Sequence, residues 1–267
     1  MIAAQHLQSQ QFRPGQLLGP YISAYCLYDF PAAMQGQSIF FLPEGIIEIV
    51  VQLGAQSQSC APGQTVWRSR PAQFVGGLHT RAYLMRIQES GKAWSIRFKP
   101  GAFRHFTVVP VHHLKNLLVA VEDIWGAAGR EWLQQCKAAR TSDLQALTEA
   151  FLLKQCALKP APFPASTLLQ FIKKRRGQCR VAELSKIACL SDAQFRLRFN
   201  EFFGISPKVF LRLYRLHYAR QQFADEQSFT SLAYQAGYFD QAHFNREVKA
   251  ISGLSPKQLF PLLGQKV

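Results

Sequence analysis

A short stop signal occurs twice in this chain, and it constrains the fold more than any other feature. "GISP" occupies residues 204–207 and "GLSP" occupies residues 253–256, each at the end of an amphipathic segment. Glycine suits the left-handed position that follows a helix, and proline suits the first turn of the next helix. Each stop therefore predicts the end of one helix and the start of another.

The segments before the two stops align along their whole length. "LSKIACLSDAQFRLRFNEFFGISP" (184–207) pairs with "LAYQAGYFDQAHFNREVKAISGLSP" (232–256) when one residue is added in the second turn. We expect two helix-turn-helix units at about 181–204 and 229–253, with Ser191 and Asp240 as the N-caps of their second helices. "PKVFLRLYRLHYARQQF" (207–223) predicts a connecting helix of about four turns.

The periodicity of each second helix separates a buried face from an exposed one. Phe195, Phe199 and Phe202 fall on the inner face of the first, and Phe244, Val248 and Ile251 on that of the second. The outer faces carry Ala193, Arg196, Leu197 and Asn200, and Gln241, Ala242, Asn245, Arg246 and Lys249. Arginine can pair with guanine and glutamine or asparagine with adenine, so these faces suit the major groove of duplex DNA.

Charge supports a polyanionic partner. The chain carries a formal net charge of +15, and residues 166–267 contain 16 Lys and Arg against 7 Asp and Glu. Nucleic acid or an anionic membrane surface would attract such a chain. Salt-dependent phosphate contacts are expected from Lys173, Arg175, Lys208, Lys249 and Lys257.

The proline-rich segment 157–165, "ALKPAPFPA", predicts a linker between domains at 1–156 and 166–267. Before it, alternating apolar residues predict a strand over 45–53 and a hairpin over 82–98 that turns at Glu89-Ser90-Gly91. Residues 122–139 and 141–156 look helical, the second with Thr141 or Ser142 as N-cap, and Ser166 is the expected N-cap of the first helix after the linker. We therefore expect an α+β chain, with a β-barrel or sandwich and a helical layer before an all-α module.

Several classes of site lack their usual patterns. The six cysteines form no C-x-x-C pair and the histidines show no metal-ligand spacing, so we expect no metal, cofactor or catalytic residue. The sequence shows neither a membrane-spanning run nor a secretory signal, and we expect a cytoplasmic, non-enzymatic protein that does not bind membranes.

The C-terminal hundred residues resemble the DNA-binding domain of AraC/XylS-type bacterial transcription regulators, above all in "AYQAGYFDQAHFNREVKAISGLSP". The resemblance implies a seven-helix module that reads a specific site in double-stranded DNA. By the family pattern, the base-facing positions are Ala193, Arg196 and Leu197 in the first unit and Gln241, Ala242, Asn245 and Arg246 in the second. RNA polymerase and a second copy of the chain are further candidate partners.

The sequence departs from the family pattern at three positions. Leu197 stands where the family often has arginine, Cys189 where the turn usually has glycine, and Val248 where phenylalanine is usual. Leucine cannot donate a hydrogen bond to a base, so readout by the first unit rests on Arg196 or on DNA shape.

The N-terminal half resembles, more loosely, the cupin-like sensing or dimerising domains often joined to this module, in "PEGIIEIVVQLG" and "SIRFKPGAFRHF". A small-molecule or protein effector is therefore expected there.

Two alternatives remain open from the sequence. Some members of the family are fused to DNA-repair alkyl transferases, which accept a methyl group on a cysteine, but such an enzyme needs a zinc-cysteine cluster or a Pro-Cys-His type motif. A basic RNA-binding or architectural protein is the second alternative. The sequence lacks aromatic strand motifs for single-stranded bases, which favours duplex DNA.

Overall fold

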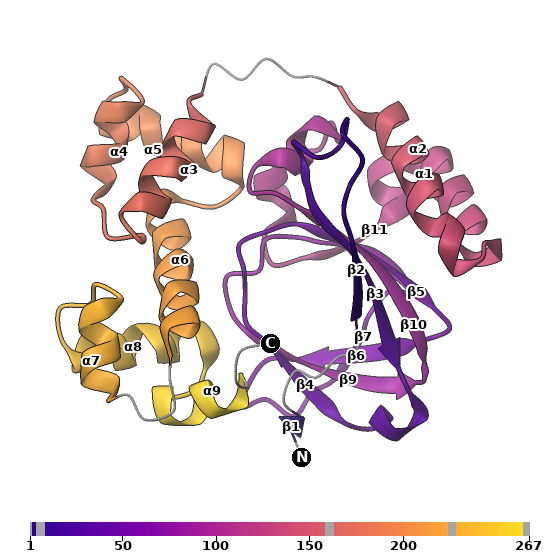
Figure 1. Ribbon diagram of the computed structural model, residues 1–267, viewed down its shortest axis with the longest axis horizontal. Helices are drawn as coiled ribbons and strands as arrows, with labels where there is room; N and C mark the ends of the chain where they lie inside the picture. Colours follow the sequence, from indigo (N-terminus) through magenta and orange to yellow (C-terminus); the bar gives the residue numbers. More distant parts are fainter. Residues whose placement is uncertain (1, 4–8, 158–162, 224–227, 264–267) are drawn as a thin grey trace.

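Two β-sheets packed as a sandwich make up most of the N-terminal half, and helices make up the C-terminal half (Figure 1). The computed structural model describes residues 2–3, 9–157, 163–223 and 228–263. One sheet has the strand order β1 (Ile2–Ala3), β4 (Ser38–Phe41), β9 (Tyr83–Glu89), β6 (Gln56–Cys60) and β7 (Arg68–Ser69). The other has the order β11 (Leu118–Ala120), β8 (Gln73–Gly76), β5 (Glu48–Leu53), β10 (Gly91–Phe98), β3 (Ile22–Phe30) and β2 (Ser9–Phe12). Of the two expected architectures, the sandwich is the one observed.

The prediction of a hairpin over residues 82–98 is wrong. β9 pairs with β4 and β6, whereas β10 pairs with β3 and β5 in the opposite sheet. The turn at Glu89–Gly91 carries the chain from one sheet to the other, and Gly91 has φ 155° beside the backbone of Ala55. Alternation shows which face of a strand is buried, but it does not show which strand is its neighbour.

Two antiparallel helices cover one side of the six-stranded sheet, as expected, but the first is broken and the second begins later than predicted. α1 (Val121–Ala138) changes direction at Gly126, whose φ is 56°. A 3₁₀ turn (Thr141–Asp143) precedes α2 (Leu144–Gln155), so neither Thr141 nor Ser142 is its N-cap. The buried indole N–H of Trp94 in β10 donates to the Thr148 hydroxyl in α2 over 3.0 Å, which joins this layer to the sheet.

In the described part of the C-terminal half, seven helices follow: α3 (Ala165–Lys174), α4 (Val181–Ile187), α5 (Asp192–Phe203), α6 (Pro207–Gln222), α7 (Phe229–Gln235), α8 (Gln241–Ser252) and α9 (Pro256–Leu262). Ser166 lies inside α3 rather than at its cap, because the helix starts right after Pro164. Proline keeps the residue before it out of the helical conformation, so the helix does not extend back beyond Pro164. Most of the expected linker, 158–162, lies outside the described residues.

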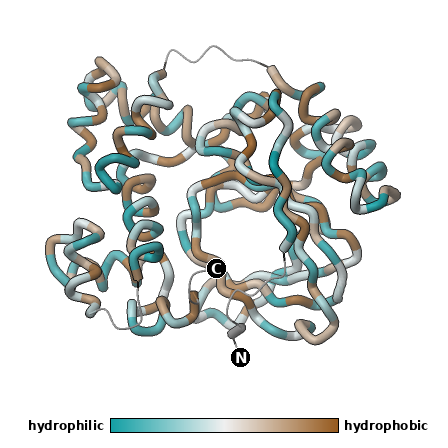
Figure 2. Tube along the Cα trace, viewed as in Figure 1, coloured by the Kyte–Doolittle hydropathy of each residue, from teal (hydrophilic) through white to brown (hydrophobic). Residues whose placement is uncertain are grey.

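One cluster of buried apolar side chains extends from the sandwich into the C-terminal helices. Figure 2 shows hydrophobic and hydrophilic residues interspersed along the helices. Among the residues that the structure describes, no helix is long and apolar enough to cross a membrane.

Candidate nucleic-acid interface

The second helix of the first unit, α5, is capped at both ends by the residues that its sequence indicates. The Ser191 hydroxyl accepts a hydrogen bond from the backbone N–H of Gln194, and Gly204 ends the helix with φ 79°. Phe195 and Phe199 are fully buried, so the helix packs by the expected face. The opposite face exposes Ala193, Arg196 and Leu197, and the leucine is 59% exposed.

The second helix of the second unit, α8, repeats this arrangement. Asp240 Oδ1 accepts from the backbone N–H of His243 over 2.6 Å, and Gly253 ends the helix with φ 75°. Phe244, Val248 and Ile251 are buried. Ala242, Asn245 and Arg246 are exposed on the outer face.

Gln241 differs from the other candidate base-facing residues because a neighbour already holds its side chain. It is half-buried, and its Oε1 accepts from the hydroxyl of Thr230 in α7 over 2.7 Å. With the oxygen engaged, the two N–H donors of the amide group have no partner among the hydrogen bonds of the described residues. The structure thus brings Gln241, Asn245 and Arg246 onto one helix face, with the first of them fixed in orientation.

The turns before α5 and α8 have the same left-handed backbone conformation. Cys189 has φ 52° and Gly237 has φ 75°. A residue with a Cβ is strained in this region, whereas glycine is not. The exposed Cys189 therefore occupies a glycine position.

The connecting helix α6 contacts both α5 and α8. Phe210 packs against Phe199 and Phe203 of α5, with ring centroids 5.6 and 5.3 Å apart. Arg212 Nε donates to Glu247 Oε2 of α8 over 2.6 Å. α5 and α8 are thus attached to one rigid element of sixteen residues.

The five cations expected at DNA phosphates are all exposed: Lys173, Arg175, Lys208, Lys249 and Lys257. Arg175 also pairs with Glu183 over 3.3 Å, so its charge is partly engaged. Sequence reasoning did not single out two aromatic residues near the start of α8, Phe239 and Tyr234, which are 84% and 62% exposed. Tyr234 belongs to α7 and lies off its buried face, whereas Phe239 lies in the turn between α7 and α8.

The helical half also contacts the sandwich at separate points. The backbone N–H of Ala82 donates to the carbonyl of Ile251, at the end of α8, over 2.8 Å. His217 in α6 donates through Nε2 to the Pro43 carbonyl over 2.8 Å, and burial lowers the pKa of this imidazole. Gly101 lies against the ring of Phe202 in α5, where a Cβ would clash.

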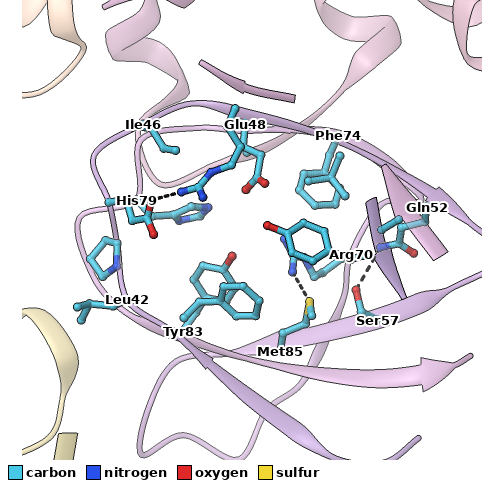
Figure 3. A pocket seen from close by; sticks show the side chains of 18 of the residues that line it. Leu42, Ile46, Glu48, Gln52, Ser57, Arg70, Phe74, His79, Tyr83 and Met85 are labelled. Atoms are coloured by element: carbon cyan, nitrogen blue, oxygen red, sulfur yellow. Dashed lines mark hydrogen bonds and ion pairs between the residues drawn. The ribbon is translucent and has the colours of Figure 1, made fainter. Parts of the chain in front are cut away.

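A cavity of about 300 Å³ lies between the two sheets (Figure 3). Its wall includes Glu48, Arg70, His79 and Tyr83 from the sandwich, and Arg220 from α6. None of these was singled out as a ligand-binding residue from the sequence, because they are far apart along the chain and form no motif.

Comparison with known proteins identifies the two halves separately. Residues 184–260 match the family described as "Helix-turn-helix domain", and residues 10–120 match a domain of unknown function, DUF6597. The chain is 34% identical over 77 residues to "Probable transcriptional regulator LumQ" of Photobacterium leiognathi, covering 28% of this chain and 31% of that protein. It is 30% identical over 94 residues to an uncharacterized HTH-type transcriptional regulator of Haemophilus influenzae, covering 35% and 32%. The matches span about a third of the length of these curated relatives.

Among solved structures, ToxT from Vibrio cholerae has a TM-score of 0.50 and 12% sequence identity to this chain, covering 90% of this chain and 98% of ToxT. This likeness concerns the fold, and it includes both halves. Residues 184–260 are therefore a helix-turn-helix domain, and the chain shares the two-domain fold of ToxT.

Proposed function

We propose that this chain is a sequence-specific DNA-binding transcription regulator that reads two adjacent major-groove segments. The observation that carries the proposal is the pair of capped helices, α5 and α8, held on the single helix α6. Sixteen helical residues extend for about 24 Å, a length that suits two recognition helices about one DNA turn apart. Arg196, Asn245 and Arg246 are the side chains best suited to read base edges.

We assign base contacts to Ala193, Arg196, Leu197, Gln241, Ala242, Asn245 and Arg246. Backbone contacts fall to Lys173, Arg175, Lys208, Lys249 and Lys257, whose exposed ammonium or guanidinium groups would replace counterions along the DNA. Leu197 can contact a thymine methyl group but cannot pair with a base, so the second unit carries more of the specificity.

We assign a separate function to each half of the chain. Residues 1–156 sense an effector or mediate dimerisation, 157–165 link the halves, and 166–267 bind DNA. The cavity between the sheets supports an effector at the N-terminal half, because binding sites for small molecules are concave and combine apolar walls with a few polar groups. RNA polymerase and a second copy of the chain are the macromolecular partners, in the cytoplasm.

Three of the six thiols, those of Cys26, Cys136 and Cys179, are poorly suited to the role of methyl acceptor in an alkyl transferase. A nucleophilic cysteine works as a thiolate, which requires a lowered pKa. Burial instead raises the pKa of Cys26, of Cys136 to about 12 and of Cys179 to about 11. These thiols stay protonated at neutral pH and are poor methyl acceptors.

Selection of bound duplexes from a random DNA pool with the full chain tests the proposal. We expect an enriched motif of two blocks about one helical turn apart, with affinity that falls steeply as salt rises. A single enriched block would mean that the first unit only contacts the backbone. The selection is repeated in the presence of benzoate, phenylacetate or hexanoate. Salt-sensitive binding without any enriched motif, with and without these compounds, would overturn the proposal in favour of nonspecific DNA binding.

A further inference from the structure

The cavity between the sheets contains an arginine without a carboxylate partner. Arg70 follows β7, and its guanidinium lies 4.6 Å from the centre of the Phe74 ring and 5.3 Å from that of Tyr83. Its Nη1 donates to the sulfur of Met85 over 2.8 Å, whereas its Nε is buried and has no hydrogen-bond partner. None of the described carboxylates forms a salt bridge with Arg70.

The other charges in the cavity wall do not supply the missing partner. Among the described residues, three arginines (Arg70, Arg97, Arg220) and two glutamates (Glu44, Glu48) line the cavity. Glu44 forms an ion pair with Arg97, and the Ser95 hydroxyl donates to Glu48. Burial raises the pKa of Glu48, an effect that the nearby Arg97 partly offsets. Arg70 also acts electrostatically on Glu48, but no salt bridge joins these two side chains.

A second polar group in the wall also lacks a partner. His79 stacks at an angle on Tyr83 with ring centroids 5.1 Å apart, and its buried Nε2 makes no hydrogen bond. Burial lowers the pKa of His79 to about 4, so the imidazole is neutral at pH 7 and can donate one hydrogen bond through Nε2. A buried donor without a hydrogen-bond partner costs free energy. The oxygens of a bound ligand would accept hydrogen bonds from both His79 Nε2 and Arg70 Nε.

The rest of the wall defines the body of the ligand. Polar and apolar side chains contribute to it about equally, and its aromatic members are Tyr28, Phe30, Phe41, Phe74 and Tyr83. Figure 3 shows Phe74 and Tyr83 among the side chains that line the cavity. The volume of about 300 Å³ is at the lower end of the range for ligand sites. At about 30 Å³ per water-sized group, it accommodates about ten non-hydrogen atoms.

We propose that this cavity binds a small organic monocarboxylate, with its carboxylate on Arg70 and His79 and its apolar body among the aromatic rings. The planar guanidinium fork matches a carboxylate in geometry. A cation would meet the positive charge of Arg70, and a phosphate dianion would bring more charge than one unpartnered arginine can neutralise. The inference rests on the proposed function in that it names the effector class of the same regulator.

Isothermal titration of the full-length chain at pH 7.5 tests the inference without DNA. The probes are benzoate, phenylacetate and hexanoate, each paired with its neutral amide, and benzylamine. We expect at least one carboxylate to bind with an affinity about ten-fold or more above that of its amide, since hydrogen bonds to charged groups contribute about 1.5 to 3 kcal/mol.

Three variants make the assignment specific. Arg70→Leu and the milder Arg70→Gln should both reduce the affinity for the carboxylate to that for the amide. Arg86→Leu is the matched control, because Arg86 also stacks on an aromatic ring, Trp67, at 3.8 Å and has a buried Nε without a partner, but it does not line the cavity. This control should bind the carboxylate as the parent chain does. Melting curves establish that each variant is folded.

Several results would overturn the inference: no carboxylate binds, amide and carboxylate bind equally, benzylamine binds best, or folded Arg70 variants retain carboxylate selectivity. These outcomes are independent of the DNA selection. An enriched DNA motif without carboxylate binding would support the proposed regulator and overturn only the inference of a carboxylate effector. Carboxylate binding without any enriched motif would support the ligand inference and overturn the proposal of sequence-specific DNA binding.

Discussion

Matching residues in the two turns, Cys189 and Gly237, share a left-handed backbone but not a side chain. Cys189 is exposed, so replacing it with glycine removes strain without removing packing. We expect Cys189→Gly to raise the free energy of unfolding by about 0.5 to 1 kcal/mol. Denaturant titration of the purified variant measures the change.

Two companion variants separate backbone strain from loss of the thiol. Cys189→Ala keeps the Cβ and should leave stability unchanged. Gly237→Ala introduces the strain into the second turn, where the new Cβ would also clash with the side chain of Gln178, and should cost about 1 to 3 kcal/mol. A stabilisation by Cys189→Ala equal to that by Cys189→Gly would refute the strain argument.

Arg246 and Lys257 are both exposed, and we propose a different kind of DNA contact for each. Arg246→Ala should relax preference at one base pair and cost about 1 to 3 kcal/mol at the preferred site, whereas Lys257→Ala should weaken all sites alike. Binding to a panel of point-mutated duplexes distinguishes the two. Uniform loss of affinity in both variants would show that Arg246 does not read a base.

His79 gives the chain a defined response to acid. Its pKa is about 4 in the folded chain against 6.5 for the free side chain, so the unfolded chain binds the extra proton between these values. The contribution of neutral His79 to stability is therefore complete above pH 6.5 and is lost as pH falls toward 4. In His79→Gln this loss is absent, so the difference in unfolding free energy between the two proteins should change between pH 7.5 and pH 5. An identical difference at both pH values would contradict the assignment.

Residue-level features were predictable from sequence where their cause is local. Ser191 and Asp240 cap α5 and α8 as predicted, because a cap and its N–H partner lie three residues apart. Arg70 and His79 were missed, because their significance depends on strands that meet only in the folded sandwich.

At the scale of elements, the bond between Trp94 and Thr148 joins the helical layer to the sheet inside the core. Thr148→Val leaves the indole N–H without an acceptor and should reduce the free energy of unfolding by about 1 to 3 kcal/mol. Thr148→Ser retains the hydroxyl and serves as the matched control, with a smaller loss from the missing methyl group. Equal losses in the two variants, measured by chemical denaturation, would show that packing rather than the hydrogen bond matters.

The existence of elements was easier to predict than their partners. The strands over 83–89 and 91–98 show clear alternation, yet the turn between them crosses from one sheet to the other. The repeated Gly-x-Ser-Pro stops predicted helix ends correctly, since glycine and proline act on the backbone at their own positions.

At the scale of the whole molecule, the contact between the two halves could not be predicted from sequence patterns. Phe202, Ile205 and Leu213 look like ordinary core residues of a helical module. However, Phe202 lies near Gly101 of the N-terminal half, and Ile205 and Leu213 lie near Gly45. Buried interior and buried interface produce the same hydrophobic periodicity.

The wall of the cavity includes Arg220, which belongs to the helix that carries both recognition helices. A ligand in the sandwich and a DNA duplex would thus act on the same helix. If the ligand changes the affinity for DNA by some factor, thermodynamics requires DNA to change the affinity for the ligand by the same factor. Operator DNA would then be an effector of the N-terminal cavity, and the two titrations, done in either order, would have to agree.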